Sequence, residues 1–123
     1  MHHTRAVGTS HAMPTRDANL DFDLIRRLRA RVAVPLVLHG SSGVPDPDLA
    51  RAIAAGMTKV NIATHLNSVF TAAVRASLEA DPSVVDTRRY LGNARTAMAA
   101  EVSRRLQLLG EPRPYRSGRV RRL

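Results

Sequence analysis

The stretch that decides the fold is VAVPLVLHGSSGVPDPDLARAIAAG, residues 32–56. It contains a short apolar run at 34–38 (VPLVL), then a histidine with a Gly/Ser turn, and then a segment with helical periodicity. A continuous apolar run too short for a helix is typical of a parallel strand that is buried on both faces. We therefore expect His39 at the end of a buried strand, beside a turn suited to binding an anion.

The segment after the turn has start and stop signals of a helix. Asp46 is a candidate N-cap, and Pro47 would then occupy the first helical position, where its missing N–H costs nothing. Gly56 is a candidate left-handed C-cap. The expected buried face of this helix consists of Leu49, Ala52 and Ile53.

The same alternation extends along the chain. The pattern predicts the end of a strand at 5–11, a helix at 22–32, a strand at 58–62, a helix capped by Thr64 that ends before 81–83, and a last helix at about 87–109. The last helix places Leu91, Ala94, Met98, Val102, Leu106 and Leu109 on one face. Helical crossovers imply parallel strands and hence an α/β fold. Three strands are few, since an eight-stranded barrel needs about 250 residues.

Composition limits the classes of protein. The chain has 123 residues, of which 44% are hydrophobic, enough for one domain with a modest core. It has no cysteine, which excludes disulfides and thiolate zinc sites. No apolar run reaches the length of a membrane span and the N-terminus has no signal-peptide pattern, so we expect a cytoplasmic protein without membrane partners.

The basic charge is uneven. The net charge is +9, and residues 111–123 hold five Arg against one Glu. We expect a folded α/β domain over 1–110 and a basic, disordered tail over 111–123. We interpret the basic charge as that of a solvated tail and not of a nucleic-acid site, because aromatic residues for base stacking are only 3% of the chain.

Polar residues follow each expected strand. These segments are GTSH (8–11), HGSSG (39–43) and NIAT (61–64), and the carboxyl ends of parallel strands meet at one rim. Gly/Ser turns and helix starts favour a phosphate. Two imidazoles could share Zn²⁺, but a catalytic zinc normally has three protein ligands, so one ligand is missing.

These segments, in this order and spacing, and DTRRYLGNAR (86–95) before the last helix resemble class II, zinc-dependent ketose-bisphosphate aldolases of the fructose and tagatose group. The resemblance covers roughly residues 6–109. It corresponds to the last three βα units and terminal helices of that family's (β/α)₈ barrel, so the expected barrel is incomplete. The implied reaction is zinc-dependent cleavage or formation of a ketose 1,6-bisphosphate from dihydroxyacetone phosphate and an aldose phosphate.

The resemblance also implies roles for individual residues. His11 and His39 match two zinc ligands, Gly40 and Ser42 match a phosphate-binding loop, Asn61 matches a contact to the reacting part of the substrate, and Thr64 matches a further phosphate contact. A monovalent cation and a homo-oligomeric assembly are further features that the family implies. His65 is interpreted as a surface residue.

Departures from the family leave alternatives open. The first zinc histidine and the catalytic aspartate have no counterpart here, and Ala12 stands where the family usually has Gly. Ala63 in NIAT is nearer to tagatose-type or generalist members of the family. The chain alone is therefore expected to be inactive, its chemistry depending on a longer reading frame or a second polypeptide. A truncated, non-enzymatic product is the alternative, and a small Arg-rich nucleic-acid-binding module is a weaker one.

Overall fold

Helices and strands alternate in the computed structural model, which describes residues 7–9 and 17–110. The elements are α1 (Phe22–Arg31), β1 (Leu36–Leu38), a 3₁₀ turn η1 (Ser41–Gly43), α2 (Asp46–Ala55), β2 (Met57–Val60), α3 (Thr64–Ala80) and α4 (Thr87–Leu109). The expected α/β class is therefore confirmed. The predicted tail at 111–123 lies outside the described residues.

In the part of the chain that the structure describes, the sheet consists of two parallel strands joined through η1 and α2. Leu36 pairs with Met57 and Leu38 with Val60, with an irregularity in register after Leu36. Beyond β2, the Asn61 N–H donates to Leu38 O at 2.9 Å and extends the pairing by one residue. Of the strand expected at 5–11, residues 7–9 are not a strand, and the remainder lies outside the described residues.

β1 is shorter and less enclosed than the sequence predicts. Only Leu38 of this strand is buried, and Val34, which we expected inside the strand, is 48% exposed. Pro35 follows Val34 and has no N–H to donate, which weakens pairing at that end. The prediction of burial on both faces is wrong for this strand, because the described residues do not cover both of its faces.

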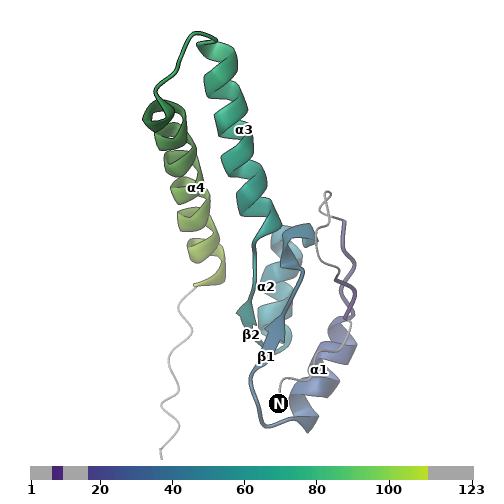
Figure 1. Cartoon of the computed structure of the whole chain (residues 1–123). Coiled ribbons are helices and arrows are strands. Elements are labelled where there is room, and N and C mark those ends of the chain that lie inside the picture. The colour runs from purple at the N-terminus through teal and green to yellow at the C-terminus, as the bar shows by residue number, and fades with distance from the viewer. Residues whose placement is uncertain (1–6, 10–16, 111–123) are drawn as a thin grey trace, which may run out of the picture.

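The apolar core lies between the sheet, α1 and α2. Its most buried side chains are Ile25 of α1, Leu38 of β1, Leu49 and Ala52 of α2, and Val44 of the preceding turn. Asp21 caps α1 by accepting a hydrogen bond from Leu24 N–H at 2.8 Å. Figure 1 shows α1 and α2 beside the short sheet.

The start of α2 differs from the prediction, and its end agrees with it. Pro45 is the N-cap, Asp46 is already helical, and no side chain caps this end. Asp46 does not cap because its carboxylate binds two arginines of α4 instead. Gly56 terminates the helix at φ +125°, a backbone conformation that residues with a Cβ rarely adopt.

α3 and α4 form an antiparallel pair that extends away from the sheet (Figure 1). Asp86 caps α4 by accepting from Arg88 N–H at 3.0 Å. The expected apolar face of α4 is only partly buried: Ala94 is fully buried, but Leu91 is 43% and Leu106 64% exposed. The periodicity predicted the helix correctly and its buried face poorly, because the described residues supply α3 alone as a packing partner along most of α4.

No helix in the described part of the chain is both long enough and apolar enough to cross a membrane.

Candidate functional site

A pocket opens where β1 and β2 end. Its volume is about 440 Å³, and it is lined by His39, Gly40, Ser42, Val60, Asn61, Ile62, Ala63 and Thr64. The residues therefore come from the segment after β1 and from the end of β2 with the segment after it, as expected for parallel strands whose carboxyl ends share a rim. The structure brings together five of the residues that the sequence singled out. The sixth, His11, lies outside the described residues.

Backbone geometry turns the first segment sharply. Gly40 has φ +65° and ψ 26°, the left-handed conformation, and the 3₁₀ turn η1 follows directly. The Ser41 hydroxyl donates to Leu38 O at 3.0 Å, and Val44 N–H donates to Ser41 O at 3.1 Å. These bonds hold the Gly/Ser turn in one shape next to the strand end.

The Ser42 hydroxyl caps the start of α3. Its Oγ accepts hydrogen bonds from His65 N–H at 3.1 Å and from Ala63 N–H at 3.4 Å, and the residue is buried. Thr64, which the sequence suggested as the cap, is the first helical residue, and the N-cap position belongs to Ala63, which has no capping side chain. A serine from another segment thus takes the place of a local cap.

His39 and Asn61 face each other across the rim. Asn61 Nδ2 lies 3.3 Å from His39 Nδ1. An amide NH₂ group can only donate, so this contact makes Nδ1 the acceptor and puts the proton of a neutral ring on Nε2. Rotation of the amide by 180° would present Oδ1 instead, move the ring proton to Nδ1 and make Nε2 able to bind a metal.

Metal-binding groups are incomplete in the described residues. Within 7–9 and 17–110, no three His, Cys, Asp or Glu side chains gather closely enough to hold a metal ion. His39 has the chemistry of a zinc ligand and lines the pocket, but a protein site normally needs at least three such ligands. The described residues thus fit one position of a zinc site and do not form a whole one.

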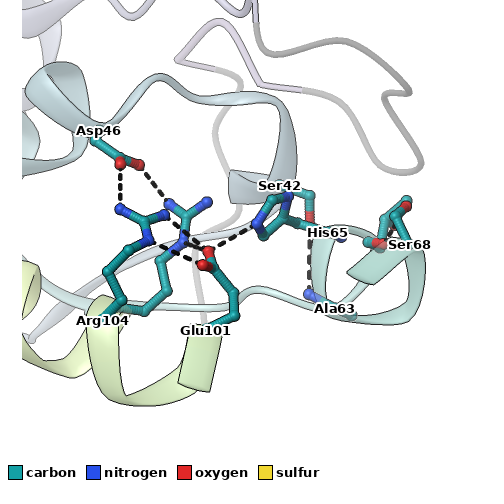
Figure 2. Close-up of polar contacts among 9 residues, drawn as sticks. Ser42, Asp46, Ala63, His65, Ser68, Glu101 and Arg104 are labelled. Carbon is teal, nitrogen blue, oxygen red and sulfur yellow. Dashed lines mark hydrogen bonds and ion pairs between the residues drawn. The ribbon is translucent and has the colours of Figure 1, made fainter. Parts of the chain in front are cut away.

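A cluster of five charged or ionisable residues lies beside the pocket, and we call it the α4 cluster: Asp46, His65, Glu101, Arg104 and Arg105. His65 Nε2 lies 2.7 Å from Glu101 Oε1, and Arg105 Nη1 lies 2.7 Å from Asp46 Oδ1. Figure 2 shows Glu101 between His65 and Arg104, with Asp46 on the far side of the arginine. The interpretation of His65 as a surface residue is therefore wrong, because its side chain is only 22% exposed and is bound by α4.

Charge pairing dominates the electrostatics of the α4 cluster. Hydrogen bonds from Arg104, and then from Arg105 and His65, hold the pKa of Glu101 well below its ordinary value of 4.5, although burial opposes this shift. The Glu101 and Asp46 carboxylates in turn raise the pKa of Arg104. Arg105 is buried and is held through Nε and Nη1, while its Nη2 has no hydrogen-bond partner among the described residues.

The α4 cluster was hard to predict from the sequence. Glu101, Arg104 and Arg105 read as the polar face of an amphipathic helix, and their partners lie 36 to 59 residues away in the sequence. The spacing of Glu101 and Arg105 by four positions was the available local signal.

Parallel strands joined through a helix, with a polar pocket at their carboxyl ends and helix starts beside it, form the arrangement in which α/β proteins commonly bind ligands. The described residues therefore have the geometry of a strand-end site of an α/β protein.

Comparisons with known proteins identify the family. The family model described as "Fructose-bisphosphate aldolase class-II" matches residues 4–112, so the chain belongs to this family. The crystal structure of the YdjI aldolase from Escherichia coli K12 superimposes with a TM-score of 0.72 at 32% identity, over 85% of this chain. A putative fructose-1,6-biphosphate aldolase from Coccidioides immitis superimposes with the same TM-score of 0.72 at 27% identity, also over 85% of this chain.

The match covers a minority of each relative. The chain spans 38% of the YdjI aldolase and 36% of the Coccidioides immitis protein. The expected resemblance to a partial aldolase barrel is therefore confirmed.

Proposed function

We propose that this chain supplies the phosphate-binding rim and part of the metal site of a class II aldolase. The reaction would be reversible aldol cleavage of a ketose 1,6-bisphosphate to dihydroxyacetone phosphate and an aldose phosphate. The observation that carries the proposal is the pocket at the ends of β1 and β2, in a chain that belongs to this family.

The lining residues suit a phosphorylated three-carbon unit. A volume of about 440 Å³ is ample for dihydroxyacetone phosphate. The left-handed Gly40 lets the backbone turn closely around a ligand, and the N-terminus of the 17-residue α3 adds positive potential beside Thr64. Asn61, at the end of β2, has an amide that can hydrogen-bond substrate oxygens.

Ser42 has a more limited part in this proposal than the sequence suggested. Its Oγ already accepts two backbone N–H groups, and its own proton remains as a donor. We therefore propose that Ser42 supports a phosphate mainly by holding the start of α3 beside the pocket, and directly through one O–H at most.

His39 is the proposed zinc ligand among the described residues, and His11 is its proposed companion. Zinc, when bound, would polarise the ketone oxygen and stabilise the enediolate that forms as the carbon–carbon bond breaks. A third ligand and a general acid would come from residues outside this chain, and we accordingly propose that the chain alone binds Zn²⁺ weakly and does not cleave substrate. Assembly into an oligomer, and a monovalent cation at the phosphate, are further parts of the family role that we propose here.

A titration tests the phosphate proposal. Dihydroxyacetone phosphate is added to the ¹⁵N-labelled chain, and shifts are expected in the amides of Gly40 and of 61–64, which line the pocket. Dihydroxyacetone, which lacks the phosphate, is the control and should leave these amides in place. Equal shifts with both compounds, or none at millimolar concentration, would contradict the proposal.

Calorimetry tests the metal proposal. Zn²⁺ is titrated into the wild-type chain and into His39→Ala, with Ser68→Ala on the exposed side of α3 as the control. Weak binding that is lost in His39→Ala and kept in Ser68→Ala is expected. Turnover of fructose 1,6-bisphosphate by the chain alone would contradict the proposed need for outside residues.

A further inference from the structure

The Glu101 carboxylate contacts three side chains: His65, Arg104 and Arg105. Its Oε1 accepts from Arg105 Nε at 2.7 Å and from Arg104 Nη2 at 2.8 Å, and it also lies 2.7 Å from His65 Nε2. Its Oε2 accepts from Arg104 Nε at 2.8 Å, and the side chain is only 14% exposed. The carboxylate does not line the pocket. It is held instead by the neighbouring side chains.

His65 transmits this contact to the rim of the pocket. Its ring is held by Glu101, while its backbone N–H donates to Ser42 Oγ at 3.1 Å. The same residue therefore joins α4 on one side and the Gly/Ser turn on the other. Figure 2 shows this sequence of contacts from Glu101 through His65 to the Ser42 side chain.

The arginines hold the other segment of the pocket. Asp46 begins α2, which follows the Gly/Ser turn after Val44 and Pro45, and it binds Arg105 Nη1 at 2.7 Å and Arg104 Nη1. Both arginines also bind Glu101. The segment after β1 and the segment after β2 are thus attached to the same point of α4.

We propose that Glu101 is a positioning residue for the pocket: through the His65 ring it holds the first turn of α3 against Ser42, and so sets the separation of the two segments that line the pocket. The part of this inference that concerns substrate rests on the proposed aldolase function. The part that concerns geometry does not.

Amide hydrogen exchange tests the geometric part. Glu101→Gln removes the charge but keeps the size of the side chain, and Glu79→Gln makes the same change on the exposed part of α3. Because hydrogen bonds to charged groups are stronger than neutral ones, exchange at the Ala63 and His65 amides is expected to accelerate about tenfold in Glu101→Gln. The Val32 amide, bound to Leu28 O at the end of α1, serves as an internal reference and should not change.

The outcomes separate positioning from general stabilisation. Acceleration confined to Ala63 and His65, and absent in Glu79→Gln, supports the proposal; no acceleration, or equal acceleration at Val32, overturns it. Should Glu101→Gln fail to fold, His65→Phe keeps a ring at this position but removes the Nε2 contact with Glu101. Exchange is then measured at the Ala63 amide, because residue 65 itself is changed. Acceleration at Ala63 supports the proposal, and no acceleration overturns it.

Dihydroxyacetone phosphate tests the substrate part. Its dissociation constant is expected to rise several-fold in Glu101→Gln and to stay unchanged in Glu79→Gln. An unchanged constant in Glu101→Gln overturns this part. Failure of the wild-type chain to bind the compound contradicts the proposed function, whereas the exchange measurements still decide whether Glu101 positions the rim.

Discussion

Replacement of Ser42 by Ala tests how α3 is held at its start. The substitution removes the oxygen that accepts the His65 N–H at 3.1 Å and the Ala63 N–H at 3.4 Å. The longer contact exceeds the usual range of about 2.7–3.2 Å, so the His65 bond should carry most of the effect. Loss of a serine cap costs about 1 kcal/mol, and a buried N–H left without an acceptor adds to that, which gives about 1.5 kcal/mol in total.

Urea denaturation followed by circular dichroism measures this change. With a slope of about 1.5 kcal/mol per molar urea, the midpoint should fall by about 1 M in Ser42→Ala. Ser68→Ala is the matched control, because the Ser68 hydroxyl donates only to Thr64 O within α3 and is exposed. The higher helix propensity of alanine should offset that loss and leave the control near the wild-type midpoint. Equal midpoints for the two variants would refute the idea that Ser42 caps α3.

Three further changes have calculable consequences. Gly56→Ala should lower the free energy of unfolding by about 3 kcal/mol in a thermal melt, because φ is +125° and a Cβ would meet Arg29 Cγ at 2.6 Å; a loss below about 1 kcal/mol would contradict this. Arg105→Met should cost about 3 kcal/mol in urea denaturation, because it leaves two partly buried carboxylates without this cation; Arg95→Met on the exposed face of α4 is the control. The lowered pKa of Glu101 means that the unfolded chain takes up a proton more readily than the folded chain, so stability is present above the ordinary value of 4.5 and is lost as pH falls below it. Urea midpoints measured at several pH values should show this loss, and the slope should become shallower in Glu101→Gln.

From residue 22 onward, the order of strands and helices could be predicted because it depends on local periodicity; the strand end expected at 5–11 is not seen at residues 7–9. The last helix was expected at about 87–109 and is observed at Thr87–Leu109, and Gly56 ends α2 in the expected left-handed region. These features depend on residues within one or two turns of each other, where apolar spacing and backbone freedom dominate. The rim residues were predicted for a related reason, since parallel strands bring their ends together whatever their side chains are.

Helix starts were predicted less well because distant groups compete for the capping residues. Asp46 has the chemistry of a cap, but two arginines 58 and 59 positions away bind its carboxylate. Thr64 likewise gives way to Ser42, which lies 22 positions earlier. The buried face of α4 was misjudged for another reason: Arg105 is buried through ion pairs, while its neighbour Leu106 is exposed. Pairing over such separations leaves no periodic trace in a sequence.

The separation between the partners of the α4 cluster also has a consequence for the order of folding during synthesis. α3 and α4 are adjacent in the chain and joined by a short connection, so their pairing closes a small loop and can form early. The bond between Asp46 and Arg105 spans 59 residues and cannot form until α4 has left the ribosome. The first turn of α3 therefore receives its outer support only after the rest of the described chain exists, and ordering of the pocket rim should be among the last events of folding.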